Sequence, residues 1–266
     1  MLLQSINSLV DVIGVWVIDV LSELGSTIMF IAQTIYIMFS KKIKFRQLVE
    51  QLKHIGVDSF PVVFLTGTSI GLALALQSYI GFSRVGALDF IGVIVTLGMT
   101  RELGPVITSL MVTGRAGSSM AAEIGSMQIS EQIDALRTLC IDPFQYLIVP
   151  RVLASTFILP FLTIFSMICG IIGGYIYCVY VLGLNPESYI ASIQQYVVLS
   201  DITGGLVKSA CFGFILSWIG TYNGYKTTGG AQGVGQSTTK SVVVGSIMIL
   251  VANYLLSSLL FKTGLA

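Results

Sequence analysis

Two charged residues interrupt an otherwise apolar stretch of the sequence. Residues 90–114 are apolar except for Arg101 and Glu102 near the centre, and Pro105 follows one turn later. An arginine in the middle of a membrane span costs about 2.5–3.5 kcal/mol on insertion scales. Adjacent residues of a helix do not face each other, so Arg101 and Glu102 cannot pair well. Pro105 also removes the hydrogen bond that its N–H would give to the carbonyl of Arg101. We therefore expect a polar, locally irregular site that faces protein or a watery cavity.

Two interpretations of Arg101 follow from this setting. In the first, Arg101 meets an anionic group of a substrate in the cavity. In the second, Arg101 forms an ion pair with a carboxylate from another span. The four uninterrupted spans delimited below contain no carboxylate. Both interpretations remain open, and this absence slightly favours the substrate.

Elsewhere the sequence offers no constellation for catalysis or metal binding. Residues 230–237 nearly match the phosphate-binding pattern GxxxxGK[ST], but Gln236 replaces the lysine and no βαβ unit surrounds the stretch. We expect it to form a flexible cytoplasmic turn that caps the last helix, and we expect the chain not to hydrolyse nucleotide. His54 is the one histidine and lies beside Lys53 in a basic stretch, which indicates a surface residue. We therefore expect no catalytic residues, no metal centre and no cofactor.

The composition is that of an integral membrane protein. Hydrophobic residues make up 54% of the 266 residues, and charged residues make up 10%, where a soluble domain carries roughly 25%. A spanning helix needs about 20 mostly apolar residues. Residues 6–39 favour an interfacial helix followed by a short or re-entrant membrane helix, and no basic n-region that would indicate a cleavable signal precedes them. Four uninterrupted spans are expected at residues 60–80, 152–186, 202–225 and 241–261, and residues 90–114 form either a kinked fifth span or a re-entrant hairpin.

The basic residues indicate the orientation of these spans. Ten of the 14 lysines and arginines fall on one side if the spans alternate across the bilayer. The positive-inside rule assigns that side to the cytoplasm, which places the C-terminus outside. Two GxxxG pairs, Gly67 with Gly71 and Gly170 with Gly174, permit close helix packing or merely reflect glycine-rich membrane helices. The ten basic residues are Lys41, Lys42, Lys44, Arg46, Lys53, Arg115, Arg137, Arg151, Lys226 and Lys240.

A short amphipathic helix is expected in the cytoplasmic loop of residues 115–150. Ser130 can cap a helix that begins at Glu131 and ends before Asp142-Pro143. Its acidic residues point away from an apolar face formed by Ile129, Ile133, Leu136 and Cys140. Such a helix could pass movement from a separate motor to the spans. It could also be an ordinary connecting helix with a solvated face, which is the interpretation that the pattern alone favours.

Four stretches of the sequence resemble one family. They are RELGPVITSLMVTGRAGSSMAAEIGSM from residue 101, EQIDAL from residue 131, DPFQYLIVPRVLA from residue 142 and YNGYKTTGGAQGVGQSTTKSVV from residue 222. Together they resemble the MlaE-like permeases of MCE-associated ABC lipid transporters, from about residue 45 to the end. The resemblance implies a homodimer with a lipid cavity, a separate cytoplasmic ABC ATPase that binds the ATP, and an MCE-domain lipid carrier on the outer side.

The resemblance also assigns roles to individual residues. It implies that the ATPase docks on the cytoplasmic helix, with Glu131, Gln132, Asp134, Ala135 and Leu136 as the coupling residues. Arg101, Glu102, Gly104 and Pro105 match the family's RELGP stretch and are our candidates for the lipid cavity.

We therefore expect an all-α integral membrane protein. It has an N-terminal interfacial or re-entrant helix, about five transmembrane helices and a cytoplasmic coupling helix. Residues 1–45 form the N-terminal segment and residues 46–266 the permease domain, with a coupling loop at 115–146. The expected function is that of a permease subunit of an ATP-driven phospholipid transporter in a bacterial inner membrane or plastid inner envelope. The alternatives are a self-contained channel or secondary transporter, and a non-transporting membrane scaffold.

Overall fold

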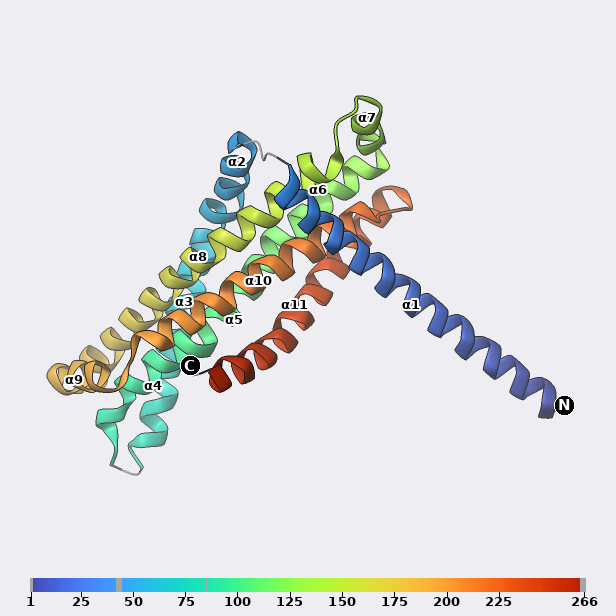
Figure 1. Ribbon diagram of the computed structural model, residues 1–266. Helices are drawn as coiled ribbons and strands as arrows, with labels where there is room; N and C mark the ends of the chain where they lie inside the picture. Colours follow the sequence, from blue (N-terminus) through green and yellow to red (C-terminus); the bar gives the residue numbers. More distant parts are fainter. Residues whose placement is uncertain (1, 42–44, 85, 264–266) are drawn as a thin grey trace.

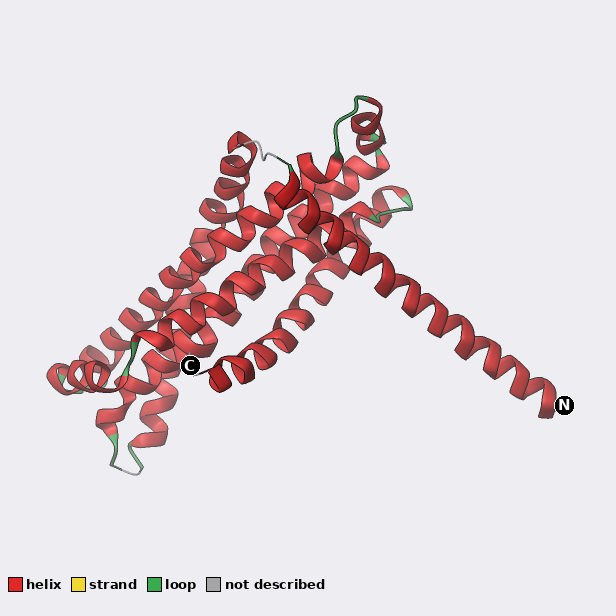
Figure 2. Ribbon diagram, in the orientation of Figure 1, coloured by secondary structure: helices red, strands yellow, loops and turns green. Residues whose placement is uncertain are grey.

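The computed structural model describes residues 2–41, 45–84 and 86–263, and within these ranges the chain is helical without strands (Figure 2). This confirms the all-α prediction. Six helices are long and apolar enough to cross a membrane, so the protein is a multi-pass membrane protein. They run over Val17–Ser40, Phe45–Phe82, Leu88–Ile129, Phe144–Val181, Leu199–Tyr225 and Gly230–Lys262.

Several of these helices are assembled from shorter pieces, in which η marks a single wider π turn or tighter 3-10 turn. The second joins α2 (Phe45–Gly56), η1 (Val57–Ser59) and α3 (Phe60–Phe82). The third joins η2 (Leu88–Phe90), α4 (Ile91–Leu97), η3 (Gly98–Leu103), α5 (Gly104–Val112), η4 (Thr113–Gly117) and α6 (Ser118–Ile129). The fourth joins η5 (Phe144–Ile148), α8 (Val149–Ile176) and η6 (Tyr177–Val181). The remaining helices are α1 (Leu2–Ser40), α7 (Gln132–Thr138), α9 (Pro186–Tyr196), α10 (Leu199–Tyr225) and α11 (Gly230–Thr263).

The third helix resolves the two expectations for residues 90–114. The chain is helical without interruption from Leu88 to Ile129, so the re-entrant hairpin is wrong and the irregular span is confirmed. The irregularity is the π turn η3, which contains Arg101 and Glu102. Pro105 lies in the first turn of α5. Single π turns of this kind occur where an extra residue is accommodated in a helix, frequently at functional sites.

The N-terminal helix α1 is one continuous helix, without the predicted break between an interfacial part and a membrane part. Two acidic residues within it, Asp19 and Glu23, are exposed on its surface and do not interrupt it. Figure 1 shows α1 running across the direction of α8 and α10, with its N-terminus far from the bundle. Its part from Val17 to Ser40 is nevertheless long and apolar enough to cross a membrane.

Glycines allow α3 and α8 to cross closely. A Cβ added to Gly71 would overlap the backbone of Gly170, and one added to Gly67 would lie 3.0 Å from the carbonyl oxygen of Ser166. A Cβ at Gly174 would lie 3.3 Å from the carbonyl oxygen of Gly71. The two GxxxG pairs therefore pack against each other, and their spacing serves close helix contact.

The bundle has two distinct ends. Figure 1 shows α2, α7 and the turn between α10 and α11 at one end, and α9 with the start of α4 at the other. The first end is the predicted cytoplasmic one, although Lys42 and Lys44 lie outside the described residues. At the other end, Asn185 caps α9 by accepting a hydrogen bond from the backbone N–H of Glu187. Burial raises the pKa of the Tyr189 hydroxyl on this helix.

The glycine-rich stretch is not a flexible turn, because α11 already begins at Gly230. Thr238 and Thr239 donate their hydroxyl hydrogens to the carbonyl oxygen of Gly235, which satisfies these side chains within the helix. Only residues 226–229 remain between α10 and α11.

Candidate functional site: a charge cluster in the bundle and a helix at its cytoplasmic end

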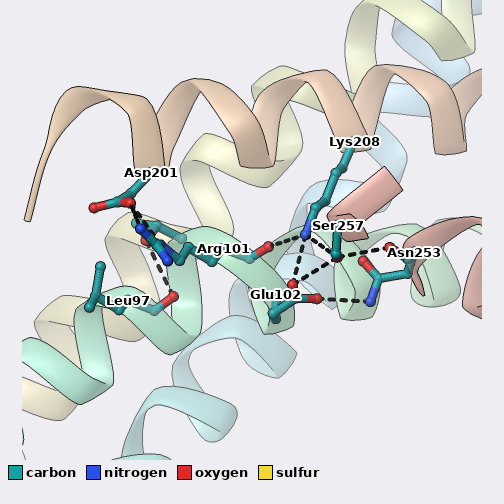
Figure 3. Close-up of polar contacts among 8 residues, drawn as sticks. Leu97, Arg101, Glu102, Asp201, Lys208, Asn253 and Ser257 are labelled. Carbon is teal, nitrogen blue, oxygen red and sulfur yellow. Dashed lines mark hydrogen bonds and ion pairs between the residues drawn. The ribbon is translucent and has the colours of Figure 1, made fainter. Parts of the chain in front are cut away.

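An ion pair between two helices holds Arg101. Its Nε donates to Oδ1 of Asp201 at 2.7 Å, and its Nη2 pairs with the same oxygen (Figure 3). Asp201 is 2% exposed in the first turn of α10, and its Oδ2 accepts the backbone N–H of Val198 at 2.9 Å. The expectation that other spans offer Arg101 no carboxylate is therefore wrong. The expected span of residues 202–225 begins one residue after Asp201, which is why this carboxylate was not counted.

Glu102 belongs to a second pair, which joins three helices. Nζ of Lys208 on α10 donates to Oε1 of Glu102 at 2.8 Å and to Oγ of Ser257 on α11 at 2.7 Å. Asn253, also on α11, donates from Nδ2 to Oε2 of Glu102 at 2.8 Å (Figure 3). The side chain of Lys208 is only 4% exposed, so its charge depends on these partners. Two cations and two anions thus form a cluster without net charge.

Lys208 also satisfies the backbone group that Pro105 leaves without a donor. Its Nζ donates to the carbonyl oxygen of Arg101 at 2.9 Å. In an ordinary helix that oxygen accepts a hydrogen bond from the N–H of the residue four positions later. Here that residue is Pro105, which has no N–H. The local irregularity expected from Pro105 is therefore present, and a lysine from another helix stabilises it. Lys208 therefore belongs to the polar site that the sequence predicted around Arg101.

A cavity of about 360 Å³ opens beside the charge cluster. Arg101 and Glu102 line it and keep 45% and 46% of their side chains exposed. Gly104 and Pro105, the other two predicted cavity residues, are buried and do not line it. A Cβ on Gly104 would overlap the carbonyl of Met99, so this glycine serves the π turn. The lining also includes Asp201, Gly204, Gly205, Lys208, Tyr254, Ser257, Ser258, Leu260 and Phe261.

The second candidate element is α7, at the opposite end of the bundle. It begins at Gln132, and Glu131 precedes it in a left-handed conformation with φ of 57°. The predicted cap is absent, because the Ser130 hydroxyl donates back to the carbonyl of Ser126. The helix also ends earlier than predicted, at Thr138. Of the predicted coupling residues, Leu136 is half-buried, and the exposed ones are Glu131, Gln132, Asp134 and Ala135.

The apolar side of α7 anchors it to the bundle. Ile133 is fully buried in a cluster with Phe144 and Tyr222, and Leu136 packs against that cluster. Ile129 and Cys140, the other two residues of the predicted apolar face, are exposed. The buried face is thus narrower than predicted, because the chain turns at both ends of α7.

Two arginines fix the remaining helices at this end. Arg115 in the π turn η4 pairs with Asp58 at 3.0 Å and donates to the carbonyl of His54 at 2.9 Å, which ties the third helix to α2. Arg151 on α8 pairs with Glu123 on α6 at 3.0 Å. The side chain of His54 is 42% exposed, in keeping with the predicted surface position. Among the described residues no group of three or more histidine, cysteine or acidic side chains could hold a metal ion.

The comparisons with known proteins agree with one another. A family model described as "Permease MlaE" matches residues 48–259. A probable ABC transporter permease protein of Rickettsia bellii is 44% identical, over 98% of this chain and all of its own length. The chloroplastic protein TRIGALACTOSYLDIACYLGLYCEROL 1 of Arabidopsis thaliana is 41% identical, over 90% of this chain and 68% of its own. The intermembrane phospholipid transport system permease protein MlaE of Haemophilus influenzae is 36% identical, over 83% and 85%.

Proposed function

Because the chain belongs to the MlaE permease family, we propose that it moves phospholipid or a related lipid between its membrane and an MCE-type carrier. Its relatives are named as permeases of ABC transporters, and the chain is accordingly a permease subunit that is not itself an enzyme. In this proposal the energy comes from ATP bound by a separate ATPase subunit, and the chain itself needs no cofactor. The site proposed for the lipid is the cavity beside the charge cluster.

The observation that carries the proposal is the half-exposed guanidinium of Arg101 in a cavity within an apolar bundle. The ion pair with Asp201 engages Nε and Nη2, which leaves further donors of the guanidinium for a ligand. The same cavity is lined by Tyr254, Leu260 and Phe261. A ligand that matches both parts of this lining has a polar head and an apolar body, as a phospholipid does.

The other partners are assigned from the two ends of the bundle. The ATPase would dock at α7, which presents Glu131 and Asp134 at the predicted cytoplasmic end. The MCE-type carrier would meet the α9 end, toward which the cavity lies. A second copy of the chain would cover the exposed apolar side of α11, which includes Tyr254 and Leu255 at 74% and 60% exposure. The proposed location is a bacterial inner membrane or a plastid inner envelope.

The direct test is lipid transfer from proteoliposomes that contain the permease with its candidate ATPase and carrier. We expect transfer of labelled phospholipid to the carrier, or from it, only when ATP is hydrolysed. ATP-independent solute flux by the permease alone would instead support the self-contained channel. An absence of any flux with all partners bound would support the scaffold. An Arg101→Ala variant that left both transfer and protein abundance unchanged would remove Arg101 from the lipid site.

Docking of the ATPase can be tested separately with Glu131→Lys. Reversing this exposed charge at an interface should weaken ATPase binding by at least about tenfold, since like charges across an interface cost several kcal/mol. Glu50→Lys is the matched control, because Glu50 is an exposed glutamate on α2 at the same end of the bundle. Affinity is measured by titrating labelled ATPase onto the permease in nanodiscs. Equal binding by wild type and Glu131→Lys would contradict docking on α7.

A further inference from the structure

Tyr225, at the cytoplasmic end of α10, joins α7 to α10. Nη2 of Arg137 on α7 donates a hydrogen bond to the Tyr225 hydroxyl, and the guanidinium carbon lies 5.9 Å from the centre of the ring. The ring itself packs between Phe144 and Phe30, with centroid distances of 5.5 and 5.8 Å. The ring is therefore held in place by apolar contacts, while its hydroxyl connects to α7.

The two ends of α7 are turns in which non-glycine residues adopt left-handed backbone conformations. Glu131 precedes the helix with φ of 57°, and Cys140 follows it with φ of 58°. Only seven residues, Gln132–Thr138, are helical between them. Because the chain bends at both ends, α7 is not a rigid extension of α6 or η5. A displacement of α7 therefore reaches the bundle through side-chain contacts, namely the buried Ile133 and the bond from Arg137 to Tyr225.

The helix that receives this contact is unbroken. All 27 residues of α10 are α-helical, whereas Leu88–Ile129 and Phe144–Val181 each contain two π turns. An uninterrupted hydrogen-bond ladder makes α10 stiffer than these two helices. Close backbone contacts with neighbouring helices also hold it along its length. A Cβ would meet a carbonyl oxygen of the third helix or of α8 at Gly205, Gly213, Gly220 and Gly224.

The far end of the same helix carries half of the charge cluster. Asp201 lies in the first turn of α10 and Lys208 two turns later. From Asp201 to Tyr225 the helix rises about 36 Å, at 1.5 Å per residue. One stiff element therefore has its two ends at the two candidate sites.

We propose that Tyr225 is a positioning residue that passes movement of α7 along α10 to Asp201 and Lys208. The proposal rests on the proposed function, because it requires an ATPase that moves α7 and a lipid that binds at the cavity. Movement of α10 along or about its axis changes the distances from Asp201 to Arg101 and from Lys208 to Glu102. These are the ion pairs that line the cavity, so the movement alters how strongly a lipid head is held.

The test is Tyr225→Phe, which removes the hydroxyl and keeps the ring. The wild-type complex and the variant are reconstituted with ATPase and carrier, and ATP hydrolysis and lipid transfer are measured together. We expect ATPase binding and hydrolysis to persist, while the lipid transferred per ATP falls roughly fivefold, the lower end of known coupling factors. Tyr36→Phe is the matched control, because Tyr36 is a 69% exposed tyrosine on α1, and it should leave the ratio unchanged.

Two further variants test whether the movement passes through the contact between Arg137 and Tyr225. Arg137→Met should lower the transfer per ATP as Tyr225→Phe does, and the double variant should be no worse than either single one. Cys140→Gly relieves the left-handed turn without touching this contact and should retain coupling. The proposal is overturned if the losses of the two single variants add in the double variant. It is also overturned if Cys140→Gly loses coupling while Tyr225→Phe keeps normal coupling. If the wild-type complex transfers no lipid with ATP, the proposed function fails first and takes this inference with it.

Discussion

Replacing Lys208 by methionine tests the charge cluster most directly. Lys208→Met keeps the length of the side chain but removes three hydrogen bonds, to the carbonyl of Arg101 and to the side chains of Glu102 and Ser257. Removing one partner of a buried ion pair costs about 3–5 kcal/mol. Glu102 keeps its bonds from Asn253 and Ser257 and is 46% exposed to the cavity. We therefore expect a smaller loss in the free energy of unfolding, about 2–3 kcal/mol.

A second substitution separates the lost pair from the other consequences of the change. Glu102→Gln in the Lys208→Met background removes the unpaired carboxylate, and the double variant should recover about 1–2 kcal/mol. The remaining loss comes from the carbonyl oxygen of Arg101, which has no donor once Lys208 is replaced, because Pro105 lacks an N–H. Leaving this oxygen without a hydrogen bond costs about 1 kcal/mol or more. The control is Lys53→Met, because Lys53 is an exposed lysine on α2 and its replacement should change stability little.

The assay is reversible unfolding in mixed detergent micelles, followed by tryptophan fluorescence and by protection of amide hydrogens. Wild type, both single variants and the double variant together give the coupling energy between Glu102 and Lys208. If Lys208→Met is as stable as wild type, or if the two losses simply add, the pair does not stabilise the bundle as described.

Two further substitutions test the packing at other places. Gly71→Ala should lower the free energy of unfolding by about 1–3 kcal/mol, because its Cβ would overlap the backbone of Gly170. The control is Gly81→Ala in the same helix, which has open space around it and should be neutral or stabilising by up to about 1 kcal/mol. Both variants are compared by thermal unfolding in detergent. Equal stability of the two would refute close packing of α3 on α8. Ile133→Ala should cost about 2–4 kcal/mol and speed amide exchange in α7, since Ile133 is fully buried. Leu139→Ala, at a 69% exposed position, should do neither, and equal exchange in both variants would show that α7 is not anchored by its apolar face.

The sequence predicted the class of the fold and the chemistry of the site better than it predicted which charged residues form ion pairs there. The irregular helix at Arg101 and the carbonyl freed by Pro105 follow from local rules, and the π turn and the bond from Lys208 confirm both. The partner Asp201 was missed because the expected span was started at residue 202, just after this charge, and no local signal says whether a carboxylate at that boundary faces the bundle. Lys208 is the one charged residue in the expected span of residues 202–225, but its contact with Glu102 depends on how α10 packs against η3.

The ends of elements were predicted less well than the elements themselves. Ser130 has the residue type of a helix cap, yet its hydroxyl already bonds to the preceding turn, so α7 begins one residue later than expected. The glycines of residues 230–237 indicated a turn, but the structure has α11 beginning at Gly230. In both places hydroxyl bonds to carbonyls of the preceding turn accompany the helix that the structure shows.

The order of the charged residues along the chain has a consequence for biogenesis. Arg101 is separated from Asp201 by 100 residues, and Glu102 from Lys208 by 106. At about 5–20 residues per second, ribosomes need roughly 5–20 s to make the second member of each pair. Throughout that interval the nascent third helix holds two charges without their later partners. We therefore expect the third helix to stay beside the insertion machinery until α10 has been synthesised, and the two helices to enter lipid together.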